Sequence, residues 1–201
     1  EKAAEIVAQN GCNDVVTVHS KPSTSLRVGE DLPERADILV AEIFDAGLIG
    51  ENALGTLRHA RANLLTEEAV IIPGKAKVFG VLLESESLYL HGCVGNVSGF
   101  DLSAFNTFSP HYLQQTINNF PHQSLSERFE VFDFDFSSTP PVRERKRIAL
   151  TPIRKGVCHG VAFWFRLFLD DDHWYDTGPD HYAGNHWQQA VQLWERPWEV
   201  D

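Results

Sequence analysis

Residues 38–51 read ILVAEIFDAGLIGE, and this stretch decides the fold. Its first four residues form a short, unbroken apolar run, which is typical of a strand inside a parallel sheet. Glu42 comes next, at the carboxyl end of that strand, where open α/β sheets place their ligands. Gly47 and Gly50 permit a tight turn, and Glu51 begins the segment after it. The stretch therefore predicts a strand, a turn and a helix, with two carboxylates at the ligand-binding edge of a sheet.

The segments on either side continue an alternation of helices and strands. Helices are expected where apolar residues recur at helical spacing, or where an Asn-Gly pair ends a short run. Strands are expected where β-branched or aliphatic residues follow one another. The expected helices are residues 3–9 and 52–65, and the expected strands are residues 15–18, 38–41 and 69–72. This alternation is typical of a doubly wound α/β sheet.

Beyond Pro73 the pattern changes to strands without long helices between them. Residues 75–84 and 161–169 are apolar runs, and phenylalanines alternate with aspartates over residues 132–136. Such a series predicts an antiparallel sheet or barrel, and therefore a domain boundary at about Pro73. The expected domains are a partial α/β domain, residues 1–73, and a β-barrel domain, residues 74–201.

Residues 107–126 interrupt this β pattern with a polar stretch that could form a short helical arm. Its apolar and aromatic side chains are Tyr112, Leu113, Ile117 and Phe120. An arm that projects freely would leave these side chains in water. The alternative is that the segment folds back on its own barrel.

Charge and cysteine content narrow the function classes. The chain has 17 Lys and Arg against 28 Asp and Glu, which gives a net charge of −11. This argues against nucleic acid as a partner, because phosphate binding needs clustered Lys and Arg; it suits a basic partner, although acidic surfaces are common in any case. No apolar run approaches the roughly 20 residues of a membrane helix. Cys12, Cys93 and Cys158 form neither a disulfide framework nor a zinc motif, so we expect a cytoplasmic protein.

Glu42 and Glu51 are the sharpest candidates for chemistry. Two carboxylates held close together repel each other unless a cation lies between them. A guanidinium suits that position because it keeps its charge and offers five donors in a plane. The alternative is that Glu51 stabilises the start of its helix and Glu42 makes a local hydrogen bond.

Acidic residues and histidines also gather over residues 170–181. Carboxylates and imidazoles are metal ligands, but the segment has no recognised ligand spacing. We therefore predict a solvated acidic loop and no metal.

The loop of residues 42–51 resembles the double-E loop of protein arginine methyltransferases, in which two glutamates stand nine positions apart, as here (51 − 42 = 9). Asp31-Leu32-Pro33 together with Ile43-Phe44-Asp45 looks most like the branches with two tandem cores. Further segments resemble the family in the same order along the chain: residues 15–18, 36–40, 63–65, 71–73, 99–103 and 185–191. The last of these resembles a Thr-His-Trp loop, with Asn185 in place of the threonine.

The resemblance implies a Rossmann-like methyltransferase domain followed by a β-barrel domain, and methyl transfer from S-adenosylmethionine to a guanidinium nitrogen of a protein arginine. Glu42 and Glu51 would hold the guanidinium. His186 would lie near the exit of the proton, and Trp187 would help to shape the arginine slot. The alternative for His186 and Trp187 is packing at the start of a barrel strand.

The same resemblance implies cofactor contacts and partners. Ser23 and Thr24 would lie near the adenine, and Thr56 where the next helix meets the cofactor. The family's glycine-rich loop would lie before Glu1, so residues 1–201 alone are expected to be inactive. The implied partners are an arginine-containing protein and a second core, as a homodimer or tandem-core pseudo-dimer that uses residues 107–126. The rival function is a non-catalytic core that acts as a binding or scaffolding module.

Overall fold

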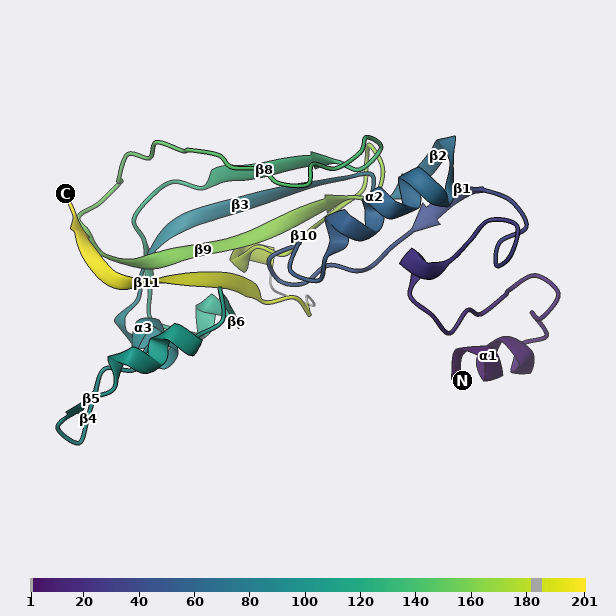
Figure 1. The fold of residues 1–201 in the computed structure, drawn as a ribbon. Helices are drawn as coiled ribbons and strands as arrows, with labels where there is room; N and C mark the ends of the chain where they lie inside the picture. The colour runs from purple at the N-terminus through teal and green to yellow at the C-terminus, as the bar shows by residue number, and fades with distance from the viewer. Residues whose placement is uncertain (1, 182–185) are drawn as a thin grey trace.

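The computed structural model describes residues 2–181 and 186–201. Its N-terminal part is a small α/β unit (Figure 1). Strands β1 and β2 pair in parallel, and α2 connects them. The bounds of these elements are α1, Lys2–Gln9; the 3-10 helix η1, Ser23–Ser25; β1, Ala36–Val40; α2, Ala53–Asn63; and β2, Leu65–Ile72. The predicted helices and the strands of residues 38–41 and 69–72 are therefore present.

One predicted strand is not formed. Residues 15–18 are irregular, and Val15 is 82% exposed. A strand needs a neighbour for its backbone N–H and C=O groups. Among the described residues β1 pairs with β2 alone, so no sheet edge is beside this segment. Ile38 and Val40, expected to be buried, are exposed; because they stand two positions apart, they lie on the same face of β1.

The larger part of the chain is an antiparallel sheet, as predicted. Its strands are β3, Lys75–Glu84; β6, Leu113–Gln115; β7, Gln123–Ser124; β8, Phe129–Asp135; β9, Gly156–Phe168; β10, Trp174–Asp176; and β11, Gln189–Val200. The order is β6-β11-β9-β3-β7, with β8 also on β3 and β10 on β9. This order does not close into a ring among the described strands, so the structure shows the sheet of the expected barrel and not a closed barrel.

The main core crosses the boundary expected at Pro73. Its aromatic centre joins Phe44 of the loop after β1 to Phe136 after β8 and Phe165 of β9, at ring-centroid distances of 6.0 and 6.4 Å from Phe44. Leu57 of α2 is buried in the same cluster. The two parts therefore share one core, which holds the loop of residues 42–51 against the large sheet.

The segment that projects from the sheet begins before the expected arm. It comprises α3, Glu86–Gly92; β4, Asn96–Val97; β5, Phe100–Asp101; and the 3-10 helix η2, Ser103–Phe108 (Figure 1). We call residues 86–108 the arm. Its exposed apolar side chains are Leu90, Val97, Phe100, Phe105 and Phe108.

Most of the stretch predicted as the arm, residues 107–126, packs on its own sheet instead. Leu113 pairs with Val191 in the β6–β11 ladder, and Ile117, in the 3-10 helix η3 (Ile117–Asn119), is only 1% exposed. Gln189 accepts the backbone N–H of Ile117, which ties the segment to β11. Ile117 is thus a core residue, and Tyr112, Leu113 and Phe120 are partly buried, as in the alternative of a segment that folds back.

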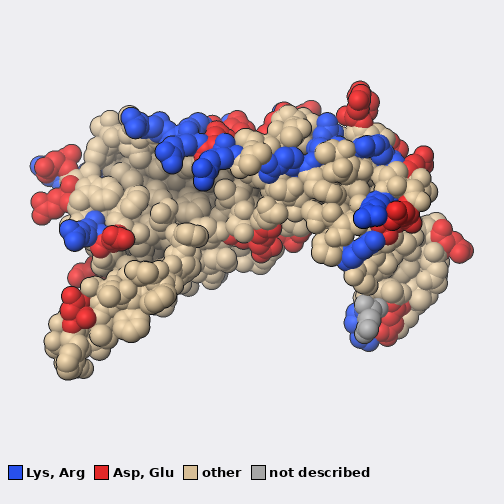
Figure 2. Space-filling model, viewed as in Figure 1, with Lys and Arg blue, Asp and Glu red and all other residues tan. Residues whose placement is uncertain are grey.

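The surface separates charged and uncharged regions. Figure 2 shows basic side chains along the edge that carries β8, whereas the projecting arm carries few charges on this face. Lys77 of β3 pairs there with Glu130 and Asp133 at 2.9 and 3.1 Å. None of the helices in the described ranges is long and apolar enough to cross a membrane.

Candidate functional site

A cavity of about 300 Å3 lies at the carboxyl end of β1, where parallel sheets place their ligands. Glu42 follows β1 and Glu51 stands two residues before α2, and both side chains are exposed. His186 and Trp187 reach the same cavity from the segment before β11. The remaining lining residues are Phe44, Asp45, Ala46, Gln114 and Gln188. The structure thus brings together the four residues predicted for arginine binding and chemistry.

Buried side chains fix the loop between the two glutamates. Phe44, Ala46 and Leu48 are buried, and Leu48 is fully so. Leu48 adopts a left-handed backbone conformation with φ 73°, which costs roughly 1–2 kcal/mol in a residue with a side chain. Its burial contributes about 1.5–3 kcal/mol and offsets that strain. The apolar positions of the loop therefore hold a strained turn that presents Glu42 and Glu51 on its exposed side.

Asp45 stabilises the turn by accepting two hydrogen bonds. Its side chain is buried, and one oxygen accepts the backbone N–H of Gly50 at 2.9 Å. The other oxygen accepts the hydroxyl of Tyr112. Burial, the hydrogen bond to Asp45, and the charges of Asp45 and Glu51 raise the pKa of the Tyr112 hydroxyl well above its ordinary value of 10. Tyr112 therefore stays protonated and remains a donor at every ordinary pH.

Trp187 connects the loop to the large sheet. Its indole N–H donates to the backbone oxygen of Phe44 at 2.9 Å. Its ring packs edge-on against Phe165 and Tyr175, with centroids 5.6 and 5.4 Å away, and the ring of His186 lies 3.9 Å from it. Trp187 therefore both packs against the large sheet and lines the cavity. Asn185 lies outside the described residues.

The residues expected at the cofactor lie in a different place. Ser23 and Thr24 belong to η1 and Thr56 to α2. Thr24 lines a second cavity of about 600 Å3, whose lining includes His59 and Asn63 but neither Ser23 nor Thr56. The remaining lining residues are Ser25, Leu26, Arg27 and Val28.

Polar side chains line part of this second cavity. The Nδ1 atom of His59 is buried and has no hydrogen-bond partner among the described residues. The hydroxyl of Thr24 and the amide of Asn63 add groups that can bond to the edge of a base or a ribose.

Within the acidic segment of residues 170–181, the turn at Asp170 is held by its own hydrogen bonds. Asp170 accepts the backbone N–H groups of Asp172 and His173 at 2.8 and 2.7 Å. Asp176, in β10, is buried and pairs with Arg166 of β9 at 2.8 Å, so the prediction of a solvated loop is wrong for this residue. Within the described ranges no three His, Cys, Asp or Glu side chains are placed to hold a metal.

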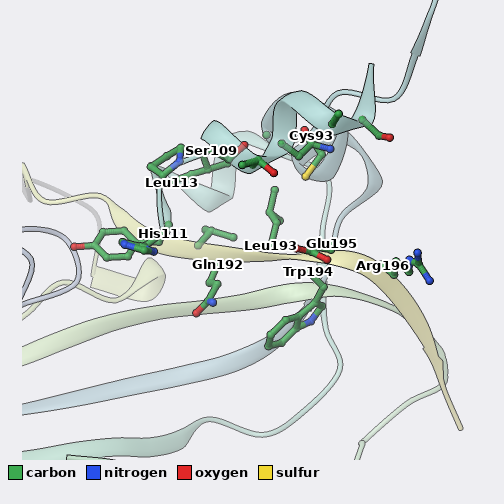
Figure 3. A pocket seen from close by; sticks show the side chains of 17 residues that line it. Cys93, Ser109, His111, Leu113, Gln192, Leu193, Trp194, Glu195 and Arg196 are labelled. Carbon is green, nitrogen blue, oxygen red and sulfur yellow. The ribbon is translucent and has the colours of Figure 1, made fainter. Parts of the chain in front are cut away.

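A larger cavity, about 590 Å3, lies between the arm and β11 (Figure 3). Figure 3 shows Leu193 on the arm side of β11 and Trp194 on the opposite side. Among the described lining residues the only carboxylate is that of Glu195, which has Arg196 as its neighbour in the chain. A guanidinium would find no pair of carboxylates there, so the smaller cavity at Glu42 and Glu51 is the better candidate site.

Sequence reasoning missed the supporting residues Asp45 and Tyr112. They stand 67 positions apart, and no local pattern links them. The only available signal was the position of Asp45 just before the glycine-containing turn.

Comparison with known proteins identifies the family of the chain. The family model described as "Arginine methyltransferase oligomerization subdomain" matches residues 75–201. The chain is 33% identical, over 198 residues, to "Arginine N(omega)-methyltransferase" of Streptomyces achromogenes subsp. streptozoticus, covering 98% of this chain and 55% of that protein. It is 29% identical, over 237 residues, to "Protein arginine N-methyltransferase 7" of Drosophila melanogaster, covering 98% of this chain and 34% of that protein. The chain therefore spans about half or less of the length of these relatives.

A solved structure supports the fold. The chain is similar to the "Trypanosoma brucei PRMT1 enzyme-prozyme heterotetrameric complex with AdoHcy", with a TM-score of 0.77 and 23% identity. The match covers 100% of this chain and 64% of that chain. Because the family model matches more than half of the sequence, the chain belongs to the arginine methyltransferase family.

Proposed function

We propose that the full-length protein transfers a methyl group from S-adenosylmethionine to a guanidinium nitrogen of an arginine in a protein. The observation that carries this proposal is that Glu42 and Glu51 line one cavity. Glu42 follows β1, and Glu51 precedes α2 at the other end of the same turn. Both carboxylates are exposed to the cavity, so a cation between them would remove their mutual repulsion. A planar guanidinium can donate to both at once.

Glu42 and Glu51 would act on the guanidinium by position and charge. Hydrogen bonds to the two carboxylates draw the positive charge toward the nitrogens that they hold, so the attacking nitrogen keeps more electron density. Trp187 forms part of the cavity wall and fixes the loop through Phe44. His186 lines the same cavity and would accept the proton that leaves the methylated nitrogen.

S-Adenosylmethionine, when bound, supplies the methyl group as a sulfonium, whose sulfur becomes neutral when the methyl leaves. Thr24, His59 and Asn63 would hold its adenosine end, with Ser23 and Thr56 as further contacts. Helix α2 borders both cavities: Glu51 stands before its first turn, and Asn63 ends it.

The proposed partners are an arginine-containing protein and a second methyltransferase core, as a homodimer or a tandem-core pseudo-dimer. The match to an oligomerization subdomain over residues 75–201 supports association. The exposed apolar side chains of the arm provide a surface that a second core could cover. The arm of residues 86–108, rather than the stretch of residues 107–126, is the contact that we propose.

Methyl incorporation tests this function directly. The full-length protein would be incubated with S-adenosylmethionine and either of two peptides that differ only in one arginine or lysine. Mass spectrometry is expected to show methylation of the arginine peptide alone. Modification of neither peptide by correctly folded protein would favour the rival function, a non-catalytic binding or scaffolding core.

A further inference from the structure

Tyr112 lies directly over the turn that carries Glu42 and Glu51. Its ring packs edge-on against Phe163 of β9, with centroids 5.4 Å apart. A Cβ atom on Gly47 would lie 2.9 Å from this ring, and one on Gly50 would collide with the hydroxyl of Tyr112. The absence of side chains at Gly47 and Gly50 therefore allows Tyr112 to lie close to the backbone of the turn.

The hydroxyl of Tyr112 completes a chain of contacts that spans the turn. Tyr112 donates to one oxygen of Asp45, and the other oxygen of Asp45 accepts the N–H of Gly50, the residue before Glu51. Asp45 itself stands three residues after Glu42. A buried carboxylate that lost one of its donors would keep one charged oxygen unpaired, and its side chain would be freer to turn away from the remaining donor.

We propose that Tyr112 is a positioning residue, which fixes the separation of Glu42 and Glu51 by holding Asp45 against the N–H of Gly50. Tyr112 is not among the residues that line the cavity of Glu42 and Glu51, and we expect it to act through Asp45. Because it precedes β6 and also lines the cavity beneath the arm, it joins the arm side of the sheet to the turn. The catalytic consequence rests on the proposed arginine methylation, whereas the effect on the turn does not.

The test compares Tyr112→Phe with Tyr89→Phe in the full-length protein. Both variants lose one hydroxyl; that of Tyr89 donates to the backbone oxygen of Glu195, in β11. Hydrogen exchange of the amides of residues 46–51 is expected to rise about tenfold in Tyr112→Phe and to stay unchanged in Tyr89→Phe, since a lost hydrogen bond to a charged group has roughly that effect. The phenylalanine ring keeps its packing on Phe163, but the unpaired oxygen of the buried Asp45 carboxylate should lower the melting temperature by a few degrees, so exchange is measured well below that temperature.

Kinetics and a second variant complete the test. In Tyr112→Phe, kcat for an arginine peptide should fall about tenfold while KM changes less than about threefold, because both carboxylates remain but are less well placed. Asp45→Asn should loosen the same amides, and the double variant should be no worse than the poorer single one. Unchanged exchange of residues 46–51 in Tyr112→Phe, or strictly multiplicative effects of the two changes, would overturn the proposal. An inactive wild type with the expected exchange pattern would overturn the methylation function and leave the positioning role standing.

Discussion

Trp187 donates its indole N–H to the backbone oxygen of Phe44 at 2.9 Å, across 143 positions of the chain. This bond joins the segment before β11 to the turn after β1. These two segments form opposite parts of the proposed arginine-binding cavity, so the bond holds them together. Phe44 is buried, so water cannot easily replace the donor.

Trp187→Phe is expected to reduce the free energy of unfolding by about 1–3 kcal/mol, the usual effect of leaving a buried acceptor without its donor. Chemical denaturation of the full-length protein measures this. Trp198→Phe is the matched control, since Trp198 is a partly exposed tryptophan of β11 far along the strand, and it should cost less than about 1 kcal/mol. Equal effects of the two changes would show that the Trp187–Phe44 bond contributes nothing special.

Acid stability should depend on Glu84. Hydrogen bonds from Gln123 and from the backbone of Val157, with a smaller effect of His159, lower the pKa of its carboxyl from the ordinary value of 4.5. A carboxyl with a lowered pKa stabilises the fold above its unfolded pKa, and that stabilisation is lost as the pH falls through the folded pKa. Glu84→Gln should therefore be less stable than the wild type near neutral pH, with the difference shrinking below pH 4.5.

Unfolding curves at several pH values measure the effect, with the exposed Glu127→Gln as control. A stability difference for Glu84→Gln that is independent of pH would contradict the assignment.

We expect the protein to self-associate through the exposed apolar side chains of the arm. Phe108 is 82% exposed at the end of η2, and a charge there would oppose burial against a second core. Phe108→Asp should weaken self-association of the full-length protein about tenfold or more, as for a central contact residue. Val142→Asp, at a side chain that is 85% exposed outside the arm, should leave it unchanged. Sedimentation equilibrium decides, and a wild type that is monomeric at high concentration would exclude the arm as a contact.

Residues 1–201 by themselves should bind S-adenosylmethionine weakly. Thr24 lines the second cavity, whereas Ser23 and Thr56 lie outside its lining, so few of the expected contacts converge. Titration calorimetry on this chain is expected to give a dissociation constant in the millimolar range or no heat. Micromolar binding would mean that the described residues already form the main contacts.

The sequence predicted well those features that depend on local pattern. The strand of residues 38–41, the helix over α2 and the antiparallel strands after Pro73 each follow from runs or periodicity within a few residues. Glu42 and Glu51 could be placed at one cavity because the turn between them is short and the resemblance to a known loop is specific.

Features set by distant contacts were beyond such reasoning. Residues 15–18 have the composition of a strand but no neighbour, since pairing is decided outside the segment. Ile117 looked like an arm residue because an apolar side chain in a polar stretch does not reveal which surface covers it; the contact with Gln189 does. Tyr112 was missed as a support of the site because its partner Asp45 lies in the other half of the chain.

The central claim is that Glu42 and Glu51 clamp an arginine guanidinium, and turnover of Glu42→Gln tests it most directly. A neutral amide keeps the shape of the side chain but cannot attract or polarise the cation. Methylation of an arginine peptide by the full-length protein, followed by mass spectrometry, should fall at least about a hundredfold in Glu42→Gln, the effect expected from removing one group that stabilises charge. Glu68→Gln, an exposed change on β2, should retain full activity. Unchanged turnover in Glu42→Gln would contradict the clamp.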